Sequence, residues 1–184
     1  MGDVYCDGTD DQEQLNAAIQ EVSECGGGIV SCSAGHFSVS APVIVRTGVT
    51  LEGRPGTCFV VPEQHGFDDV SNMITVFDDP VMVGAIIRNE RAEDPTLATD
   101  RNIAIRGISL DGRQGIGDSS IYAPQNHHAG ILLYGCDSCV IENCRVRGIA
   151  HIDISHVDPY ARQYGICVAS CTNVHVERCV TDEN

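Results

Sequence analysis

The sequence contains no tryptophan, and its 184 residues include only four phenylalanines and five tyrosines. Because large aromatic rings are scarce, we expect a narrow core filled by stacked aliphatic side chains. No run of about 18 consecutive apolar residues occurs, so the sequence predicts no membrane-spanning helix. A cationic, apolar leader is also missing after Met1, and we expect that any export signal was removed or never existed.

Basic side chains are scarce as well. Lysine and arginine together number 11 against 26 aspartates and glutamates, which gives a formal net charge of −15. Binding to nucleic acid requires a basic surface that neutralises phosphates, so the charge excludes a nucleic-acid partner. It also opposes binding of an acidic polymer unless calcium bridges the two, and calcium is the one cofactor that the sequence suggests.

Two stretches near the end of the chain repeat each other. Residues 130–144 (GILLYGCDSCVIENC) and 165–179 (GICVASCTNVHVERC) superpose without a gap, so that Gly130 falls on Gly165 and Cys144 on Cys179. An earlier copy, residues 102–108, fits the same pattern upstream of the first. Self-similarity at a fixed period is typical of a stacked solenoid.

The spacing indicates which solenoid. Alternating apolar residues within each copy, such as Ile103 and Ile105, predict strands that bury one side. The two copies are offset by 35 residues, from Gly130 to Gly165. Three short strands with turns need about 20–25 residues, so each repeat contains one coil and a loop of about ten residues. The polar stretches 113–129 and 151–163 are those loops. A β-sandwich is disfavoured, since neither Asp7-Gly8 nor Asp111-Gly112 separates two matched alternating runs.

We therefore predict one domain over residues 1–184: a cap with a helix in 1–28, followed by coils in 29–184. Asp10 or Asp11 can cap the helix, the glycines at 26–28 end it, and its apolar face covers the open end of the first coil, 29–53. Segments 73–77 and 81–87 are expected in a second coil. Nothing covers strand 174–179, so we expect either that the chain continues or that another copy closes the coil in a homo-oligomer.

The ten cysteines have two interpretations. Cys139 shares its repeat position with Ile103 and Val174, which indicates that it is a small buried hydrophobe with a reduced thiol. Reduced thiols favour the cytosol or a protected core, but the compartment stays open, extracellular action included. The alternative is a zinc site from Cys136, Cys139, Cys167 and Cys171. We expect Cys136 in a turn and Cys139 inside, so the sulfurs would not converge, and we predict no metal site.

Several sequence blocks occur in a fixed order: DGTDD at 7–11, GGGIV at 26–30, SAGHF at 33–37, GVTLEG at 48–53 and ISLDGR at 108–113. Together with the repeated coils, this order resembles the pectate-lyase-like (pectin-lyase-fold) right-handed parallel β-helix superfamily over most of the chain. Ser33 stands where that family usually has proline. The resemblance implies an all-β, right-handed parallel β-helix with a short N-terminal capping α-helix. It does not specify an activity, because the fold hosts lyases, hydrolases, epimerases and phage tailspikes.

The catalytic motifs of two branches of that superfamily are missing from this chain. The Asn-Thr-Asp triplet of polygalacturonase-like members corresponds to Arg162-Gln163-Tyr164, which has no aspartate. In the Tyr-Gly-Phe-Asp-Pro-His run of alginate-epimerase-like members, residues 164–169 keep the tyrosine but have Cys167 and Ala169 in place of the aspartate and histidine. Neither catalytic set carries over to this sequence.

The best candidate site from the residues themselves is the stretch 151–164. Ile152 and Ile154 alternate with polar residues, so on a strand those polar side chains face outward together. A carboxylate beside imidazoles can supply a general acid and a general base, or ligate a divalent metal. Of the adjacent histidines 127 and 128, only one can face this site. The predicted catalytic residues are His151, Asp153, His156, Asp158 and Arg162, and the predicted substrate-binding residues are Asp111, Arg113, His128, Tyr160 and Tyr164.

The leading functional hypothesis is a carbohydrate-active protein that binds a polysaccharide along the flank with the two loops and cleaves it as a lyase or glycoside hydrolase. One alternative is a non-catalytic structural or adhesive β-helix, such as a phage tailspike module. Another is a metal-binding protein that uses the His/Asp cluster, and a third interpretation of the cluster is an exposed polar loop.

Overall fold

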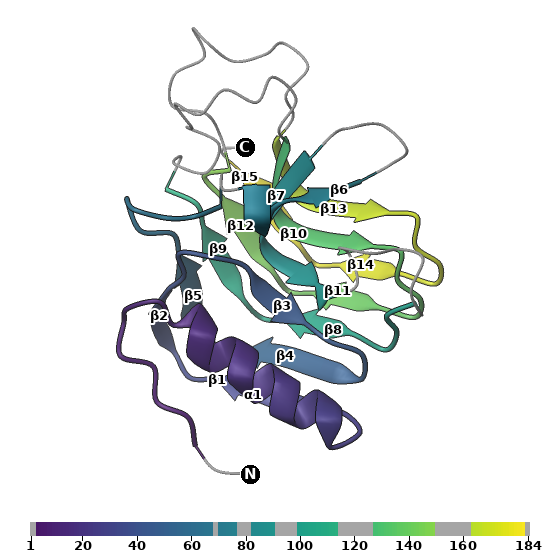
Figure 1. Ribbon diagram of the computed structural model, residues 1–184, viewed down its shortest axis with the longest axis horizontal. Helices are drawn as coiled ribbons and strands as arrows, with labels where there is room; N and C mark the ends of the chain where they lie inside the picture. Colours follow the sequence, from purple (N-terminus) through teal and green to yellow (C-terminus); the bar gives the residue numbers. More distant parts are fainter. Residues whose placement is uncertain are drawn as a thin grey trace, which may run out of the picture.

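The chain folds into a right-handed parallel β-helix, in which strands of successive coils lie above one another. The structure is a computed structural model that describes residues 3–67, 70–76, 82–90, 99–113, 127–149 and 163–182. The sequence runs along the stack, from the purple strands at one end to the yellow strands at the other (Figure 1). The fold predicted from the repeat is confirmed.

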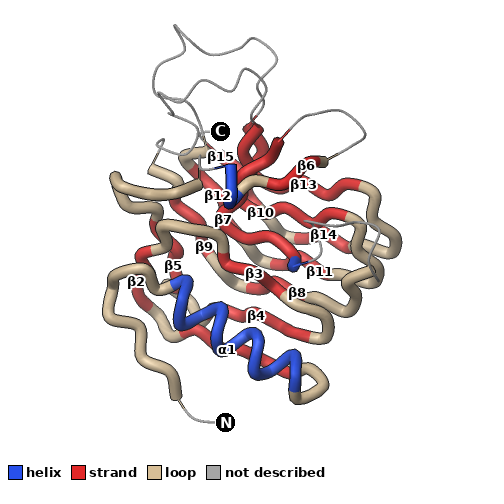
Figure 2. Tube along the Cα trace, in the orientation of Figure 1, coloured by secondary structure: helices blue, strands red, loops and turns tan. Residues whose placement is uncertain are grey.

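Three parallel sheets form the sides of the coil, with loops at the corners (Figure 2). The first sheet contains β1 (Gly28–Cys32), β4 (Val49–Gly53), β8 (Ala104–Arg106), β11 (Val140–Glu142) and β14 (His175–Glu177). The second sheet contains β3 (Val43–Val45), β7 (Met82–Asn89), β10 (His127–Tyr134) and β13 (Gln163–Ala169). The third sheet contains β2 (Gly35–Ser38), β5 (Thr57–Val60), β9 (Ser109–Asp111), β12 (Arg145–Arg147) and β15 (Val180–Asp182).

The register of the strands follows the sequence repeat. Ile105, Ile141 and Val176 pair in series across β8, β11 and β14. Arg145 pairs with Val180, so that the preceding residues, Cys144 and Cys179, lie in adjacent layers. Equivalent apolar groups are therefore stacked along one axis, as the repeat predicts.

Two boundaries differ from the prediction. Gly28 pairs with Val49, so the first coil closes after 21 residues and β4 already belongs to the second coil. Segment 73–77 is not a rung of the ladder. Its short strand β6 (Ile74–Thr75) follows the 3-10 helix η1 (Val70–Asn72) and pairs antiparallel with β7, so it runs against the direction of the parallel ladder.

The interior is a column of small apolar side chains. Phe59, Leu51 and Ile141 are fully buried, and cysteines 32, 136, 139 and 144 belong to the same core cluster. The interpretation of the repeat cysteines as buried hydrophobes is confirmed for Cys139 and Cys144, while Cys179, in the last described coil, is only partly buried. Cys136 lies between β10 and β11, outside the strands as expected, but its side chain is buried in the core. Gly135, with a φ of +63°, turns the chain so that Cys136 faces inward.

Helix α1 (Gln12–Glu24) covers one end of the column, where it lies across β1, β3 and β4 (Figure 1). It buries Leu15, Ile19 and Val22, and after its end at Glu24 the chain turns at Gly26 and Gly27, both with positive φ. Among the described helices, none has the length and apolar character needed to cross a bilayer.

Asp11 precedes α1, but its side chain does not cap the helix. The fully buried carboxylate instead accepts hydrogen bonds from the backbone N–H groups of Gly8 (2.9 Å) and Ser38 (2.7 Å). Asp11 therefore fastens the N-terminal segment and the start of α1 to β2.

Candidate functional site

The strand ends that flank the long connections between repeats lie at one corner of the coil. Residues 61–81, 112–126 and 148–162 all run from the end of a third-sheet strand to the start of a second-sheet strand. We call this edge the loop corner; on its described sides lie the C-terminal ends of β5, β9 and β12 and the N-terminal ends of β7, β10 and β13. The flank predicted to carry the site is this corner.

The second sheet borders the loop corner and is apolar on both faces. Its inner face contributes Ile87 and Ile131 to the core. Its outer face carries a separate cluster, formed by Ile74, Val76, Val83, Ala85, Ala129, Leu132, Tyr134 and Ala169, against which Tyr164 and Cys167 pack. A sheet buried on both faces loses the apolar–polar alternation that marks a surface strand.

Tyr164 lies on this outer face beside His127. The two rings meet edge to face, with centroids 6.1 Å apart and an interplanar angle of 89°. Tyr164 pairs in register with Ala129, which pairs with Ala85, so small side chains follow the tyrosine along the sheet. A partly exposed aromatic ring above a flat apolar surface is suited to stacking against the apolar face of a sugar ring.

The two adjacent histidines take different environments. His128 is only 1% exposed, pairs with Gly84 and Gln163, and places its ring 3.2 Å from where a Cβ added to Gly84 would lie. His127, and not His128, contacts Tyr164. The strand alternation thus separates the pair as expected, while a substrate-binding role for His128 stays a prediction.

Arg88 is a candidate that the sequence reasoning missed. It lies on β7 in register with Leu132, on the same outer face, and is only 3% exposed. Its guanidinium donates a hydrogen bond to the Asn89 carbonyl oxygen over 3.3 Å. A buried cation requires compensating polar partners, so Arg88 marks a polar site within the otherwise apolar outer face. A lone arginine inside the run VGAIIRN gave the only sequence signal for it.

On the third-sheet side of the corner, Asp111 and Arg113 lie together at the end of β9. The Asp111 carboxylate accepts a hydrogen bond from the Arg113 backbone N–H (3.0 Å) and pairs with the Arg147 guanidinium of the next rung (2.7 Å). Asp182 follows Arg147 in register, and it pairs with Arg145. These alternating charges connect successive rungs.

The predicted catalytic cluster lies outside the described residues. His151, Asp153, His156, Asp158, Tyr160 and Arg162 all belong to segment 150–162, which leads directly into β13 at Gln163. Their roles stay predictions. The described residues closest to them in sequence, Gln163 and Tyr164, begin β13 at the loop corner.

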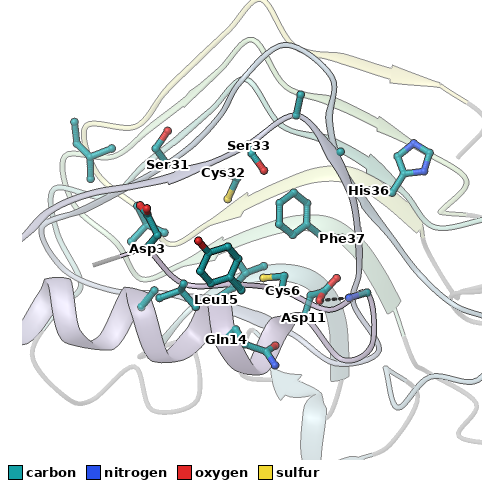
Figure 3. Close-up of a pocket in the computed structure, with 18 of the residues that line it drawn as sticks. Asp3, Cys6, Asp11, Gln14, Leu15, Ser31, Cys32, Ser33, His36 and Phe37 are labelled. Atoms are coloured by element: carbon teal, nitrogen blue, oxygen red, sulfur yellow. Dashed lines mark hydrogen bonds between the residues drawn. The ribbon is translucent and has the colours of Figure 1, made fainter. Parts of the chain in front are cut away.

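A cavity lies at the capped end of the molecule, below the helix. It has a volume of about 660 Å³ and lies between segment 3–8, α1 and the strands β1 and β2 (Figure 3). Burial raises the pKa of the Cys32 thiol to about 12 and raises the pKa of Cys6, while the Asp11 carboxylate is held by backbone N–H groups. The lining therefore provides no activated nucleophile, and the cavity is the incompletely filled end of the coil.

Within the described ranges, no group of three or more His, Cys, Asp or Glu side chains is arranged to hold a metal ion. Segments 114–126 and 150–162, the second of which carries the predicted His/Asp cluster, lie outside those ranges.

Comparison with known proteins places this geometry in a family. The profile of the family described as rhamnogalacturonase A/epimerase, pectate lyase-like, matches residues 2–181. The chain belongs to this family. No curated protein matches the sequence.

Solved structures of similar fold include proteins of different activities. A candidate glycosyl hydrolase from Parabacteroides merdae superposes with a TM-score of 0.59 at 16% identity, over 98% of this chain and 85% of that one. The A-module of a mannuronan C-5 epimerase from Azotobacter vinelandii gives 0.53 at 17% identity, over 98% and 48%. A tailspike protein of E. coli bacteriophage HK620, in complex with a pentasaccharide, gives 0.58 at 16% identity, over 98% and 33%.

At these identities the likeness establishes the shared fold. The chain spans most of the first structure, about half of the second and about a third of the third.

Proposed function

We propose that this protein binds a polysaccharide along the loop corner and acts on it as a lyase or glycoside hydrolase. The observation that carries the proposal is the aromatic surface formed by His127 and Tyr164, at the corner where the strands before and after the long connections end and begin. Membership of the rhamnogalacturonase A/epimerase family supports a carbohydrate ligand. A tailspike of the same fold is solved with a bound pentasaccharide, which supports it further.

The proposed chemistry uses segment 150–162. Asp153 and His156 would act as the proton-transferring pair, because cleavage of a glycosidic bond requires a general acid at the leaving oxygen and a base or nucleophile on the other side. His151, Asp158 and Arg162 would position the pair and balance charge. Tyr164 would stack against the sugar, and Asp111 and Arg113 would line the opposite side of the corner.

The test is product release from a panel of neutral and acidic polysaccharides, with and without calcium. Unsaturated products indicate a lyase and new reducing ends without unsaturation indicate a hydrolase. Asp153→Ala and His156→Ala should each lower the rate by at least about a hundredfold, whereas Asp7→Ala, at the cap, should retain it. Unchanged rates in both loop variants would exclude the proposed pair.

Binding without product by the wild-type protein would support the alternative, a structural or adhesive β-helix such as a tailspike module. Metal retained by protein purified without a histidine tag, and lost in His151→Ala and His156→Ala, would instead support a metal-binding role for the same cluster.

We further propose that copies of the chain associate through the last described coil. Val168 and Val176 of this coil are 38% and 45% exposed, while their register partners Leu133 and Ile141 are fully buried. Within the described chain, β13, β14 and β15 each pair on one side only, and unpaired strand edges invite pairing. Light scattering at high protein concentration tests this, and a monomer there would contradict it.

A further inference from the structure

Cysteine side chains from two neighbouring rungs meet inside the corner between the second and first sheets. Cys136 and Cys139 follow β10, and Cys171 follows β13 at the equivalent place. The Cys136 N–H donates a hydrogen bond to the Cys171 sulfur over 3.3 Å. Side-chain hydrogen bonding with Cys139 and Cys171 raises the pKa of the Cys136 thiol. We call these three residues the thiol corner.

Cys136 and Cys171 occupy the same position in successive rungs. The residues that follow them, Asp137 and Thr172, pair directly in the parallel ladder. Neighbouring strands lie about 4.8 Å apart, and a disulfide needs Cα atoms about 4.4–6.8 Å apart. A bond between these two sulfurs therefore fits the existing spacing of the rungs.

The three thiols differ in reactivity. Hydrogen bonding by the Cys136 thiol and backbone N–H lowers the pKa of the Cys171 thiol to about 6. The pKa of Cys139 is also lowered by its hydrogen bond with Cys136, but Cys139 is fully buried, whereas Cys171 is only partly buried. The thiolate is the nucleophilic form of cysteine, so Cys171 is the accessible nucleophile of the corner.

Stacking alone does not produce this property. Cys144 and Cys179 are stacked in the same two rungs, and their thiols point at backbone carbonyl oxygens, as do those of Cys136 and Cys171. The contact that distinguishes the thiol corner is the hydrogen bond from the Cys136 N–H to the Cys171 sulfur. Burial raises the pKa of Cys144 to about 11. In the cap cavity, Cys6 and Cys32 have raised pKa values as well, so Cys144, Cys6 and Cys32 serve as internal controls (Figure 3).

We propose that the thiol corner is a site of oxidative modification, at which hydrogen peroxide or an organic hydroperoxide joins Cys171 to Cys136 and thereby fastens two rungs together.

The chemistry balances in two steps. The Cys171 thiolate attacks one peroxide oxygen, the O–O bond breaks, and sulfenic acid forms while the other oxygen leaves as hydroxide and takes up a proton as water. The Cys136 thiol then loses its proton and attacks the Cys171 sulfur, so that the S–S bond forms, the S–O bond breaks and a second water leaves. Two thiols are oxidised and one hydrogen peroxide is reduced to two waters; an organic hydroperoxide gives one water and the alcohol. A thiol reductant reverses the change.

Tryptic mapping of the full wild-type chain separates the candidate bonds. Cleavage after arginines 113, 145, 162 and 178 places Cys136, Cys139 and Cys144 in peptide 114–145, Cys171 in peptide 163–178, and Cys179 in peptide 179–184. One sample of reduced protein receives a brief, limiting pulse of iodoacetamide at neutral pH. A second receives hydrogen peroxide before the remaining thiols are blocked.

We expect Cys171 to be alkylated at least about tenfold faster than Cys144 or Cys32. Peroxide should link peptides 114–145 and 163–178, and fragmentation should place the bond between Cys136 and Cys171. The link should disappear in Cys171→Ser and persist in Cys167→Ser, which alters the same peptide. Equal labelling of all cysteines, a link from 114–145 to 179–184, a bond confined to 114–145, or no bond at all would overturn the proposal.

Discussion

Ile141 and Val176 lie one above the other in neighbouring rungs of the first sheet, yet Ile141 is fully buried and Val176 is 45% exposed. Truncation of Ile141 leaves a cavity inside the column, so Ile141→Ala should lower the free energy of unfolding by about 2–5 kcal/mol. Val176→Ala removes a half-exposed group and should cost less than about 1 kcal/mol. Urea unfolding of the two variants measures the difference, and equal losses would contradict the stacking order.

Gly130 marks the closest approach between β10 and the neighbouring rungs. A Cβ at this position would lie 2.2 Å from a Val146 methyl group and 2.7 Å from the Gly165 carbonyl oxygen. Gly130→Ala should therefore destabilise the protein by about 1–3 kcal/mol through overpacking.

Gly135→Ala is the matched control for that substitution. Gly135 has a positive φ of +63°, but a methyl group added there would approach nothing within 4 Å beyond its chain neighbours, so only backbone strain of about 1–2 kcal/mol is expected. Thermal unfolding of both variants measures the difference. If Gly135→Ala is much less stable than Gly130→Ala, close packing around β10 does not limit which side chain Gly130 can be replaced by.

Asp137 connects two rungs at the surface. Hydrogen bonds donated by Thr172 (2.7 Å) and Asn173 (2.8 Å) hold the pKa of its carboxyl below the usual 3.8. A group with a depressed pKa in the folded state stabilises above its unfolded-state pKa, and this stabilisation is lost as pH falls through the folded-state pKa.

Asp137→Asn should therefore unfold at a lower urea concentration than the wild type at neutral pH. The gap should close as the pH falls below 3.8, because the wild-type carboxyl then becomes protonated. Urea midpoints measured across this range test the prediction, and a gap that is independent of pH would mean that the ionised carboxylate does not contribute.

The net charge of −15 predicts how the protein treats acidic glycans. Electrostatic repulsion should keep the affinity for an acidic polysaccharide low unless calcium bridges the two surfaces. Calorimetry should show tighter binding of acidic glycans with calcium than with a chelator, and no calcium effect on neutral glycans. Equal affinity for acidic glycans with and without calcium would show that the ion does not bridge the protein and the glycan.

The sequence repeat predicted the fold because residues that stack in successive coils recur at the same position of the repeat. Ile103, Cys139 and Val174 recur at one position, and periodicity of this kind survives changes of side chain. The outer face of the second sheet could not be predicted in the same way. β10 reads HHAGILLY, which has no alternation, and a strand covered on both faces cannot be oriented from its pattern alone.

The candidate site was predictable only in part. The sequence placed Tyr164 and the loop segments on one flank, and strand alternation separated His127 from His128. The sequence did not predict that Arg88 is buried on the outer face of the second sheet or that the Cys136 side chain points into the core. Both depend on contacts between rungs that are distant in sequence, and a single repeat copy does not encode those contacts.

Glycan binding at the loop corner is the central claim, and one comparison tests it most directly. Tyr164 lies at the loop corner, whereas Tyr5 is 86% exposed beside the cavity at the capped end. With a glycan that the wild type binds, Tyr164→Ala should weaken the affinity about threefold to tenfold, and Tyr5→Ala should leave it unchanged. Loss of binding in Tyr5→Ala with full affinity in Tyr164→Ala would contradict the account and place the ligand at the cap.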